Sequence, residues 1–331
     1  MALVRITFTV EANCAGWRLD RYLQEKIRRL SRERVQQLIE TRLEHDGPGR
    51  LKPGTRVAPG LTFTLLREAE PEPEAPLGFR VLHDDGALLV VDKPAGLPVH
   101  PTARYAAHTF TALARERFPD RKVDPAHRLD RETSGLLACG AAPQWTRALK
   151  AAFARGKVSK TYLALALGAP AGDRFEVDAP LALTLGSEVR VRMHVHPAGL
   201  PSATGFEVLG RRQACDGAPV ALIACRPRTG RQHQIRAHLH HAGLHLVGDK
   251  IYGHDEMVFD RFTKGEMTPD DHARMRLPRQ ALHAWRLELP HPRTGERTAL
   301  ECPLAPDLEA FWEGCREPGD GSHPPSLGFD G

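Results

Sequence analysis

Apolar and polar positions alternate at the start of the chain and then change to a helical spacing. Residues 4–10 alternate between the two classes, which is the period-two pattern of a half-buried strand. Apolar residues within 19–30 fall at helical spacing, and Ser31 can cap a second helix whose apolar stripe lies within 35–39. A strand-like stretch at 61–66 closes this region. The pattern therefore predicts a small unit with strands and two short helices that face each other.

Strand patterns dominate from Phe79 onward, and the helices are fewer and lie between them. The predicted strands cover residues 81–82, 88–92, 136–139, 161–167, 189–195, 220–225 and 282–289, and the predicted helices cover 110–118, 143–155 and 232–242. The pattern ends in a predicted hairpin whose first strand is 282–289 and whose turn lies around residues 292–295. Because the strands come in runs, we expect an α+β fold with a mixed, largely antiparallel sheet, and not a doubly wound fold.

An acidic, proline-rich segment separates the two regions. It reads EAEPEPEAP at 68–76, a composition that resists both helix and sheet and behaves as an extended spacer. After Trp312 the chain has no apolar periodicity. We therefore predict a small N-terminal α/β domain at 1–67, a linker at 68–77, a large domain at 78–313 and a disordered tail at 314–331.

The composition narrows the class of protein. Of the 331 residues, 41% are hydrophobic and 26% are charged, which is typical of a chain with a folded core and excludes disorder over most of its length. No apolar run exceeds six residues, which is far too short to span a bilayer, and no secretory pattern opens the chain. The six cysteines form no Cys-x-x-Cys pair, which argues against a zinc ribbon and a disulfide framework. We expect a soluble, cytoplasmic protein with no membrane partner.

The charge distribution favours a polyanionic partner. Basic residues exceed acidic ones by 46 to 41, giving a net charge of +5. A dense basic corner lies where the two N-terminal helices meet, formed by Lys26, Arg28, Arg29, Arg32 and Arg34. Such a cluster can bind nucleic-acid phosphates, or it can be a solvated face without a ligand. No glycine-rich dinucleotide or triphosphate motif occurs at a strand end, so no nucleotide cofactor is indicated.

Two arginine-rich segments interrupt the apolar rhythm of the large domain. The first, HRLDRETSG at 127–135, places Asp130 among guanidinium groups. These keep a carboxylate ionised, which suits a nucleophile or an electrostatic stabiliser, although a surface loop held by salt bridges has the same composition. In the second, at 226–236, Arg236 lies beside apolar Ile235 where a helical stripe begins. An arginine that points inward there needs a carboxylate partner.

A third polar segment, 157–162, leads a predicted strand and ends in Tyr162. Its ring offers a flat face for stacking and its hydroxyl can take part in proton transfer. A tyrosine at the start of a strand is also commonly part of the core.

The first arginine-rich segment closely resembles the active-site motif of the RluA family of pseudouridine synthases. The match is HRLDRETSGLL at 127–137, and its aspartate is Asp130. Other stretches resemble further motifs in the family's order: DKPAGLPVHP at 92–101, KTY at 160–162, RTGRQHQIRAHL at 228–239, GD at 248–249, YG at 252–253 and LHA at 282–284. In the N-terminal region, LDRYL at 19–23 and SRERVQQLI at 31–39 are similar to the alpha-L RNA-binding motif. Together the resemblance covers residues 16–312.

The resemblance implies the pseudouridine synthase fold and the isomerisation of uridine to pseudouridine in RNA. This reaction breaks the N-glycosidic bond, turns the uracil and joins its C5 to the ribose. Asp130 would attack the sugar or assist proton removal from it, and Arg236 would pair with Asp130. Tyr162 would stack on the base and assist loss of the C5 proton. Arg128 would fill the space that the flipped base leaves, and Ile235 is a further candidate substrate-binding residue.

The resemblance also implies which RNA the protein acts on. Family members act on large-subunit ribosomal RNA or on transfer RNA, and the alpha-L motif with the basic corner favours ribosomal RNA. The implied enzyme is a monomer without a cofactor or a metal. The segment 254–280 is rich in charges, lacks a clear period and receives no role.

Two other classes of function compete with this interpretation. Four histidines after the second arginine-rich segment, His238, His240, His241 and His245, could mark a metal-dependent hydrolase, although Gly243 is expected to end the helix before the last of them. A non-catalytic RNA-binding protein could keep the fold without the chemistry. The presence of Asp130, Tyr162 and Arg236 together argues against that class.

Overall fold

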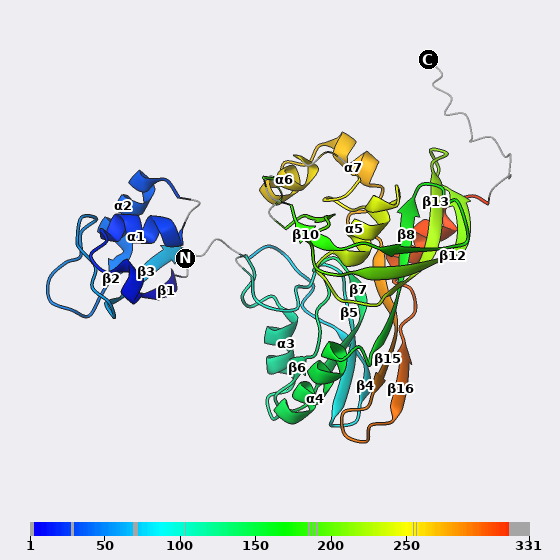
Figure 1. The fold of residues 1–331 in the computed structure, drawn as a ribbon, viewed down its shortest axis with the longest axis horizontal. Helices are drawn as coiled ribbons and strands as arrows, with labels where there is room; N and C mark the ends of the chain where they lie inside the picture. The colour runs from blue at the N-terminus through cyan, green and yellow to red at the C-terminus, as the bar shows by residue number, and fades with distance from the viewer. Residues whose placement is uncertain are drawn as a thin grey trace, which may run out of the picture. The chain divides into compact units, whose positions relative to one another are not determined.

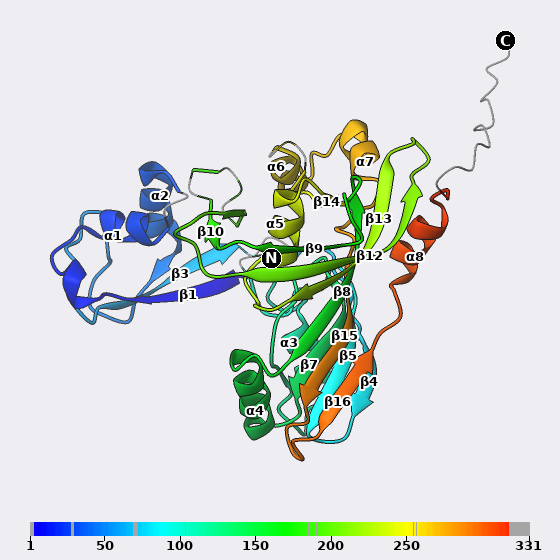
Figure 2. The same ribbon diagram turned by 45° about the vertical axis from the view of Figure 1, so that its right-hand side comes forward.

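The computed structural model divides the chain into two compact units, Met1–Glu72 and Pro73–Gly331. The structure describes residues 3–27, 30–68, 72–102, 104–184, 186, 187, 189, 191–253, 255 and 257–317. Figures 1 and 2 show the course of the chain. In this described part, no helix combines the length and the apolar character that crossing a membrane requires.

The first unit is a three-stranded antiparallel sheet with two helices. Its elements are β1 (Leu3–Thr9), the 3-10 helix η1 (Ala12–Cys14), α1 (Leu19–Lys26), α2 (Arg32–Arg42), β2 (Leu43–Glu44) and β3 (Thr62–Glu68), and the strand order is β1-β3-β2. Ser31 caps α2, because its Oγ accepts a hydrogen bond from the amide of Arg34. Leu23 from α1, Val35 from α2 and Phe63 from β3 are buried in one apolar cluster. Packing between the helices and the sheet therefore forms the core of this unit.

The second unit contains the remaining elements. In chain order they are β4 (Arg80–Asp84), β5 (Leu88–Lys93), α3 (Phe110–Arg117), β6 (Asp124–Pro125), β7 (Ser134–Gly140), α4 (Pro143–Ala154), β8 (Ser159–Leu167), β9 (Arg174–Asp178), β10 (Leu181–Leu183), β11 (Met193–Val195), β12 (Ala203–Gln213), β13 (Pro219–Pro227), α5 (Gln234–His241), β14 (His245–Leu246), α6 (Met257–Lys264), α7 (Pro269–Met275), β15 (Leu282–Pro290), β16 (Arg297–Glu301) and α8 (Pro306–Glu313).

One large mixed sheet organises the second unit. Its strand order is β4-β5-β7-β15-β8-β13-β12-β9, with β14 on β8, β16 on β15 and β6 on β7, while β10 and β11 form a separate pair. The pairing of β7 with β15 is parallel, and the other described pairings of this sheet are antiparallel. The α+β prediction with a largely antiparallel sheet is therefore confirmed.

Helices cover both faces of the half of the sheet that contains β8 and β13. Successive side chains of a strand point to opposite faces, so Ala164 in β8 packs with Leu239 of α5, whereas Leu165 packs with Leu308 of α8. Figure 2 shows α5 and α8 on opposite sides of this half. Burial on both faces explains why the end of β8 is a continuous apolar run.

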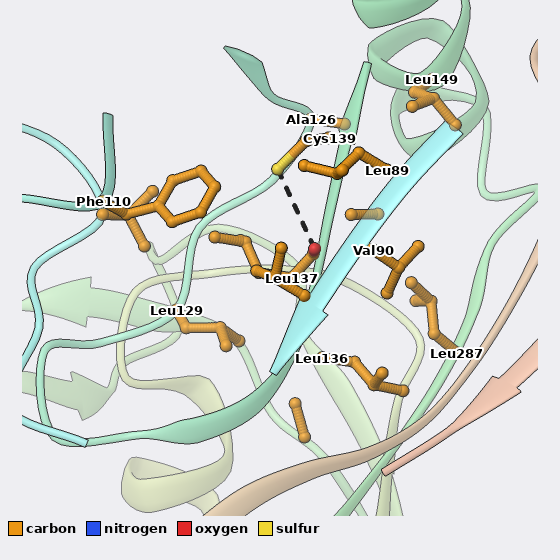
Figure 3. Close-up of a cluster of buried hydrophobic side chains, with 14 of the residues drawn as sticks. Leu89, Val90, Phe110, Ala126, Leu129, Leu136, Leu137, Cys139, Leu149 and Leu287 are labelled. Atoms are coloured by element: carbon orange, nitrogen blue, oxygen red, sulfur yellow. Dashed lines mark hydrogen bonds between the residues drawn. The ribbon is translucent and has the colours of Figure 1, made fainter. Parts of the chain in front are cut away.

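The other half of the sheet has its core beside α3 and α4. The first four residues of β5 and all of β7 are buried, and Figure 3 shows Leu89, Leu137 and Phe110 of α3 packed in this cluster. Leu149 of α4 and Leu129 from the loop before β7 belong to the same cluster. The loop that carries the aspartate of the 127–137 motif is thus anchored in the core on its N-terminal side.

Several elements differ from the prediction. The eleven-residue strand β12 was not predicted, since two glycines and several charged residues interrupt its apolar alternation. The helices α6, α7 and α8 were also not predicted, and the strand expected at 189–195 is confined to Met193–Val195. The three helices are only seven or eight residues long, too short for a clear periodic pattern.

The folded part extends further toward the C-terminus than the predicted domain. Cys315 is buried, and the backbone of Arg316 exchanges hydrogen bonds with Gln213 at the end of β12. Residues 314–317 therefore belong to the folded unit and not to a disordered tail. The rest of that predicted tail, 318–331, and residues 69–71 of the predicted linker lie outside the described residues.

We predict that Gly135→Ala destabilises the second unit by more than about 2 kcal/mol. Gly135 has a φ of +102°, and a Cβ there would lie 2.3 Å from the carbonyl oxygen of Ala284 in β15. Gly205→Ala in β12 is the matched control, because its Cβ would meet nothing within 4 Å, and we expect a change within about 0.5 kcal/mol. Thermal unfolding measures both variants. Equal melting temperatures would show that β7 and β15 adjust to a side chain.

Candidate active site

The loop between β6 and β7 carries Asp130 and is held by Lys93. Lys93 is fully buried at the end of β5 and donates to three backbone carbonyl oxygens, one of which is that of Arg131 at 3.1 Å. The amide of Gly96 donates to the same oxygen at 2.8 Å. Burial lowers the pKa of Lys93 to about 7. The 92–101 motif therefore serves to position the loop.

Arg236 joins Asp130 to a second carboxylate. Its side chain is 5% exposed on α5, and its NH1 donates to Oδ2 of Asp130 at 2.9 Å. Its Nε and NH2 bind the two oxygens of Asp249 at 2.7 and 2.8 Å. Asp249 is fully buried and also accepts the amides of Ile251 and Tyr252. The guanidinium is thus fixed by a bidentate ion pair before it contacts Asp130.

This arrangement keeps both carboxylates ionised. Burial opposes the ionisation of Asp130, but the nearby His233 and Arg236 hold its pKa below the ordinary value. Burial likewise opposes the ionisation of Asp249, and Arg236 lowers its pKa. Although burial disfavours a cation, Asp249 and Asp130 raise the pKa of Arg236. Asp130 is therefore a carboxylate at neutral pH, available as a nucleophile or a base and not as a general acid.

A cavity of about 660 Å³ opens beside Asp130. Arg128, Tyr162 and Ile235 line it, so the structure brings all five predicted catalytic and substrate-binding residues of the large domain to one place. The wall also includes apolar side chains such as Phe153 and cations such as Lys160, Arg228 and Arg231. A concave, partly apolar site with a positive lining suits a flat base attached to phosphates.

Tyr162 reaches this cavity from β8. Its backbone lies between Cys225 of β13 and Ala284 of β15, which fixes its position in the sheet. Burial, together with the charge of Asp130, raises the pKa of its hydroxyl well above the ordinary value. The hydroxyl therefore stays protonated at neutral pH.

The basic corner of the first unit is partly described. Arg28 and Arg29 lie outside the described residues. The other three members contact partners within the unit: Lys26 pairs with Glu11, Arg32 lies 3.3 Å from Asp20, and Arg34 donates to Gln37 at 2.6 Å. The Arg32 side chain is 60% exposed and Arg34 is exposed. These contacts leave both guanidiniums accessible from solvent.

Within the described part of the chain, no three of the histidines that follow the second arginine-rich segment lie close enough together to hold a metal ion. Both ring nitrogens of His238 are hydrogen-bonded to protein atoms, Nδ1 to Thr204 Oγ1 at 2.9 Å and Nε2 to the Ala179 carbonyl oxygen at 3.0 Å. With both nitrogens used, the ring serves to fasten α5 to β12 and has no lone pair for a metal. The interpretation as a metal-dependent hydrolase loses its basis.

Among the described residues, one group has metal-ligand spacing: His83, Asp85 and His291. The Nδ1 of His291 accepts the amides of Arg293 and Thr294 at 3.3 and 3.2 Å, so its proton is on Nε2, which donates to Asp85 at 2.6 Å. The group is therefore a hydrogen-bonded cluster that links the β4–β5 turn to the β15–β16 hairpin.

Sequence reasoning did not identify four residues of this site as functional. Lys93 and Asp249 were noted only as parts of motifs, and His233 and Gln280 were not singled out. Gln280 donates to Oδ2 of Asp130 at 3.4 Å, and His233 Nε2 lies 3.9 Å from the same oxygen. The available signal was the inward-pointing Arg236, which needs a carboxylate partner. The resemblance gave Asp130 as that partner, and Asp249 is the first acidic residue after the histidines.

The chain is similar to known RNA-modifying enzymes. Residues 87–241 match the model of the RNA pseudouridylate synthase family. Ribosomal large subunit pseudouridine synthase D of Nitrosomonas europaea is 34% identical, over 94% of this chain and 88% of the relative. Ribosomal large subunit pseudouridine synthase C of Pasteurella multocida is 30% identical, over 93% of each. A solved structure, that of the human protein "RNA Pseudouridylate Synthase Domain Containing 1", is also similar. The match covers 74% of this chain and 91% of the human chain, with 25% identity and a TM-score of 0.58.

We predict that Asp249→Ala lowers the free energy of unfolding by about 3 to 5 kcal/mol, because it leaves Arg236 buried with half of its partners. The pKa of Asp249 is lower in the folded protein than in the unfolded chain, where it is about 3.9, so its ionised form stabilises the fold at pH values above 3.9. This stabilisation is lost as the pH falls through the pKa of the folded state. The variant's stability should therefore depend less on pH in the acid range than that of the wild type. Denaturant unfolding at several pH values measures this.

Asp173→Ala is the control for removal of a carboxylate. Asp173 pairs with Arg211 on the surface and is 79% exposed, so we expect a loss of less than about 1 kcal/mol. Equal losses in the two variants would contradict a structural role of the buried pair.

Proposed function

Because the chain belongs to the RluA family of pseudouridine synthases, we propose that it isomerises specific uridines of large-subunit ribosomal RNA to pseudouridine. The protein is an isomerase that acts on uridine in RNA. The choice of ribosomal RNA is supported by relatives of this name that align along nearly the whole chain, the N-terminal unit included.

One observation carries the chemical part of the proposal. Asp130 is held ionised by Arg236 at the wall of a cavity that a flipped nucleotide can enter. A carboxylate can break a glycosidic bond either by bonding to the sugar carbon or by removing a proton from the sugar. Both routes require the ionised form, which the ion pair with Arg236 maintains.

The remaining lining residues fit the handling of the base. To reach Asp130 the uridine must leave its stack, at a cost of a few kcal/mol. We propose that Arg128 offsets part of this cost, because it is exposed at the cavity and can enter the space that the uridine leaves in the RNA stack. Tyr162 presents its ring to the uracil, and Ile235 contributes an apolar contact on the α5 side.

We assign to the first unit a contact with RNA outside the active site. The support is the exposed guanidiniums of Arg32 and Arg34, beside Arg28 and Arg29 in the sequence. Phosphate contacts of this kind add affinity without selecting a base. We further propose that the enzyme is monomeric and cytoplasmic, and free thiols at all six cysteines are compatible with a reducing compartment.

We predict that Asp130→Asn abolishes pseudouridine formation while the protein remains folded, because the amide keeps the shape and removes the charge. Pseudouridine mapping of cellular RNA is done in a deletion strain carrying the wild type, Asp130→Asn or the surface control Asp173→Asn. The wild type and the control should restore the same sites in large-subunit ribosomal RNA. Restoration by Asp130→Asn would exclude the catalytic role, and sites found in transfer RNA alone would exclude the proposed substrate.

A second prediction separates stacking from proton transfer at Tyr162. The raised pKa keeps the hydroxyl protonated, so we expect the ring to matter more than the oxygen. Tyr162→Phe should retain kcat/KM within about 10-fold, whereas Tyr162→Ala should lose about 10- to 100-fold with the stacking energy. Tritium release from C5-labelled uridine in RNA measures both. If Phe is as inactive as Ala, the hydroxyl is required.

A further inference from the structure

The polar contacts of Asp130 are unevenly divided between its two oxygens. Oδ2 accepts from NH1 of Arg236 at 2.9 Å and from Nε2 of Gln280 at 3.4 Å, and Nε2 of His233 lies 3.9 Å from it. Within the described residues, every side-chain contact of Asp130 falls on Oδ2. The Asp130 side chain is 25% exposed and lines the cavity. One oxygen is therefore bound by the protein, and the other is left for a ligand.

His233 approaches Asp130 from an unusual backbone conformation. Its φ is +53° and its ψ is 18°, the left-handed region, which costs free energy for a residue with a β-carbon. It is the residue before α5, so this turn directs its side chain into the cavity beside Asp130. Strain of this kind persists only where the surrounding structure imposes it.

Tyr252 sets the orientation of the His233 ring. The hydroxyl oxygen of Tyr252 accepts the amide of Met193 at 3.0 Å and lies 3.3 Å from Nδ1 of His233. The hydroxyl proton is then directed to Nδ1, which leaves the ring proton on Nε2. Burial lowers the pKa of His233 to about 4, so the ring is neutral at pH 7. A neutral N–H group thus faces Oδ2.

Gln280 approaches from the segment that received no role in the sequence analysis. It is 2% exposed, and its Nε2 also contacts Thr133 Oγ1 at 2.8 Å. Its own backbone amide lies 3.4 Å from a carboxylate oxygen of Glu132. These contacts attach Gln280, two residues before β15, to the part of the loop that follows Asp130.

We propose that His233 and Gln280 are positioning residues that, together with Arg236, anchor Oδ2 of Asp130 and reserve Oδ1 as the oxygen that reacts with the ribose. This rests on the proposed function. Two hydrogen bonds, from Arg236 and Gln280, converge on this oxygen, and the ring of His233 approaches it to 3.9 Å. Together they restrain the rotation of the carboxylate about its Cβ–Cγ bond, so Oδ1 keeps one direction toward the cavity.

Both routes of glycosidic cleavage are compatible with this assignment. If Oδ1 is a nucleophile, the Oδ1–C1′ bond forms as C1′–N1 breaks, with its electron pair going to uracil. The ester bond then breaks when C5 attacks C1′. If Oδ1 is a base, it takes a proton from C2′ as uracil leaves and returns it when C5 bonds to C1′. In both cases N1 gains the proton that C5 loses, so no co-reactant is needed.

The test uses the full-length protein and a short RNA that contains the modified uridine. Four variants are compared. At position 233, His233→Gly removes the ring and relaxes the backbone strain, and His233→Gln returns an amide donor. At position 280, Gln280→Met removes the donor, and Gln280→Glu places a carboxylate beside Oδ2. We expect kcat to fall about 10- to 100-fold in the Gly, Met and Glu variants, with little change in KM. His233→Gln should recover part of the loss.

The acid limb of the kcat/KM profile is the readout that a purely structural role would not move. Fewer donors on Oδ2 make the carboxylate harder to ionise, so the limb should move to higher pH in the order wild type, Gln280→Met, Gln280→Glu. Gln232→Glu is the matched control. Gln232 lines the same cavity but contacts Val191 and not Asp130. Its added charge should raise KM by repelling RNA and leave the limb in place.

The outcomes separate failure of this inference from failure of the proposed function. A wild type that forms no pseudouridine in any RNA contradicts the function. An active wild type whose His233→Gly and Gln280→Met variants keep its kcat and acid limb overturns the positioning role. The limb is compared only over the pH range in which each variant remains folded, since unfolding in acid would also move it. His233→Asn and Gln280→Asn, which shorten the reach to Oδ2, replace a variant that does not fold, with the same expected shift.

Discussion

The buried guanidinium of Arg236 is the charge on which the active site depends. It binds Asp249 with two hydrogen bonds and Asp130 with a third. Burying such charges is costly unless each one is paired, so the three side chains are stable only together. They come from the loop before β7, from α5 and from the turn after β14, which are up to 119 residues apart in the chain. The pair that keeps Asp130 ionised therefore also holds these three parts of the domain together.

The order of strands explains how distant residues reach one cavity. The strands β7, β15, β8 and β13 are consecutive neighbours in the sheet. Asp130 precedes β7, Gln280 precedes β15, Tyr162 lies in β8, and α5 with Arg236 follows β13. Because neighbouring strands are about 5 Å apart, residues near the adjoining ends of four of them converge within the span of a nucleotide. The parallel pairing of β7 with β15 is part of this arrangement, since it places the entries to both strands side by side.

The site combines a rigid reactive group with an adaptable positive lining. The carboxylate of Asp130 is restrained by buried donors, and the left-handed backbone of His233 shows that the fold accepts strain to place one group near it. The cations around the cavity are different, because Arg128 is exposed and Arg228 lies on the surface beside Glu176. Such side chains can follow the phosphates of RNA without disturbing the reactive group. Precision and affinity are thus supplied by separate sets of residues.

The sequence alone determined the chemistry and the class of fold. The uninterrupted match at 127–137 identifies Asp130, a helical stripe points Arg236 inward, and the strand patterns predict the antiparallel sheet, because each of these signals is local. The strand β12 and the helices α6, α7 and α8 escaped prediction, since β12 lacks a regular apolar alternation and the helices are short. Asp249, His233 and Gln280 could not be assigned to the site, because the contacts that place them there join separate parts of the chain. That a second carboxylate, Asp249, meets the buried arginine, and which oxygen of Asp130 is bound, depend on strand order and on the left-handed turn before α5. Only the tertiary structure decides these, because no local pattern encodes contacts between residues as far apart as 130 and 280.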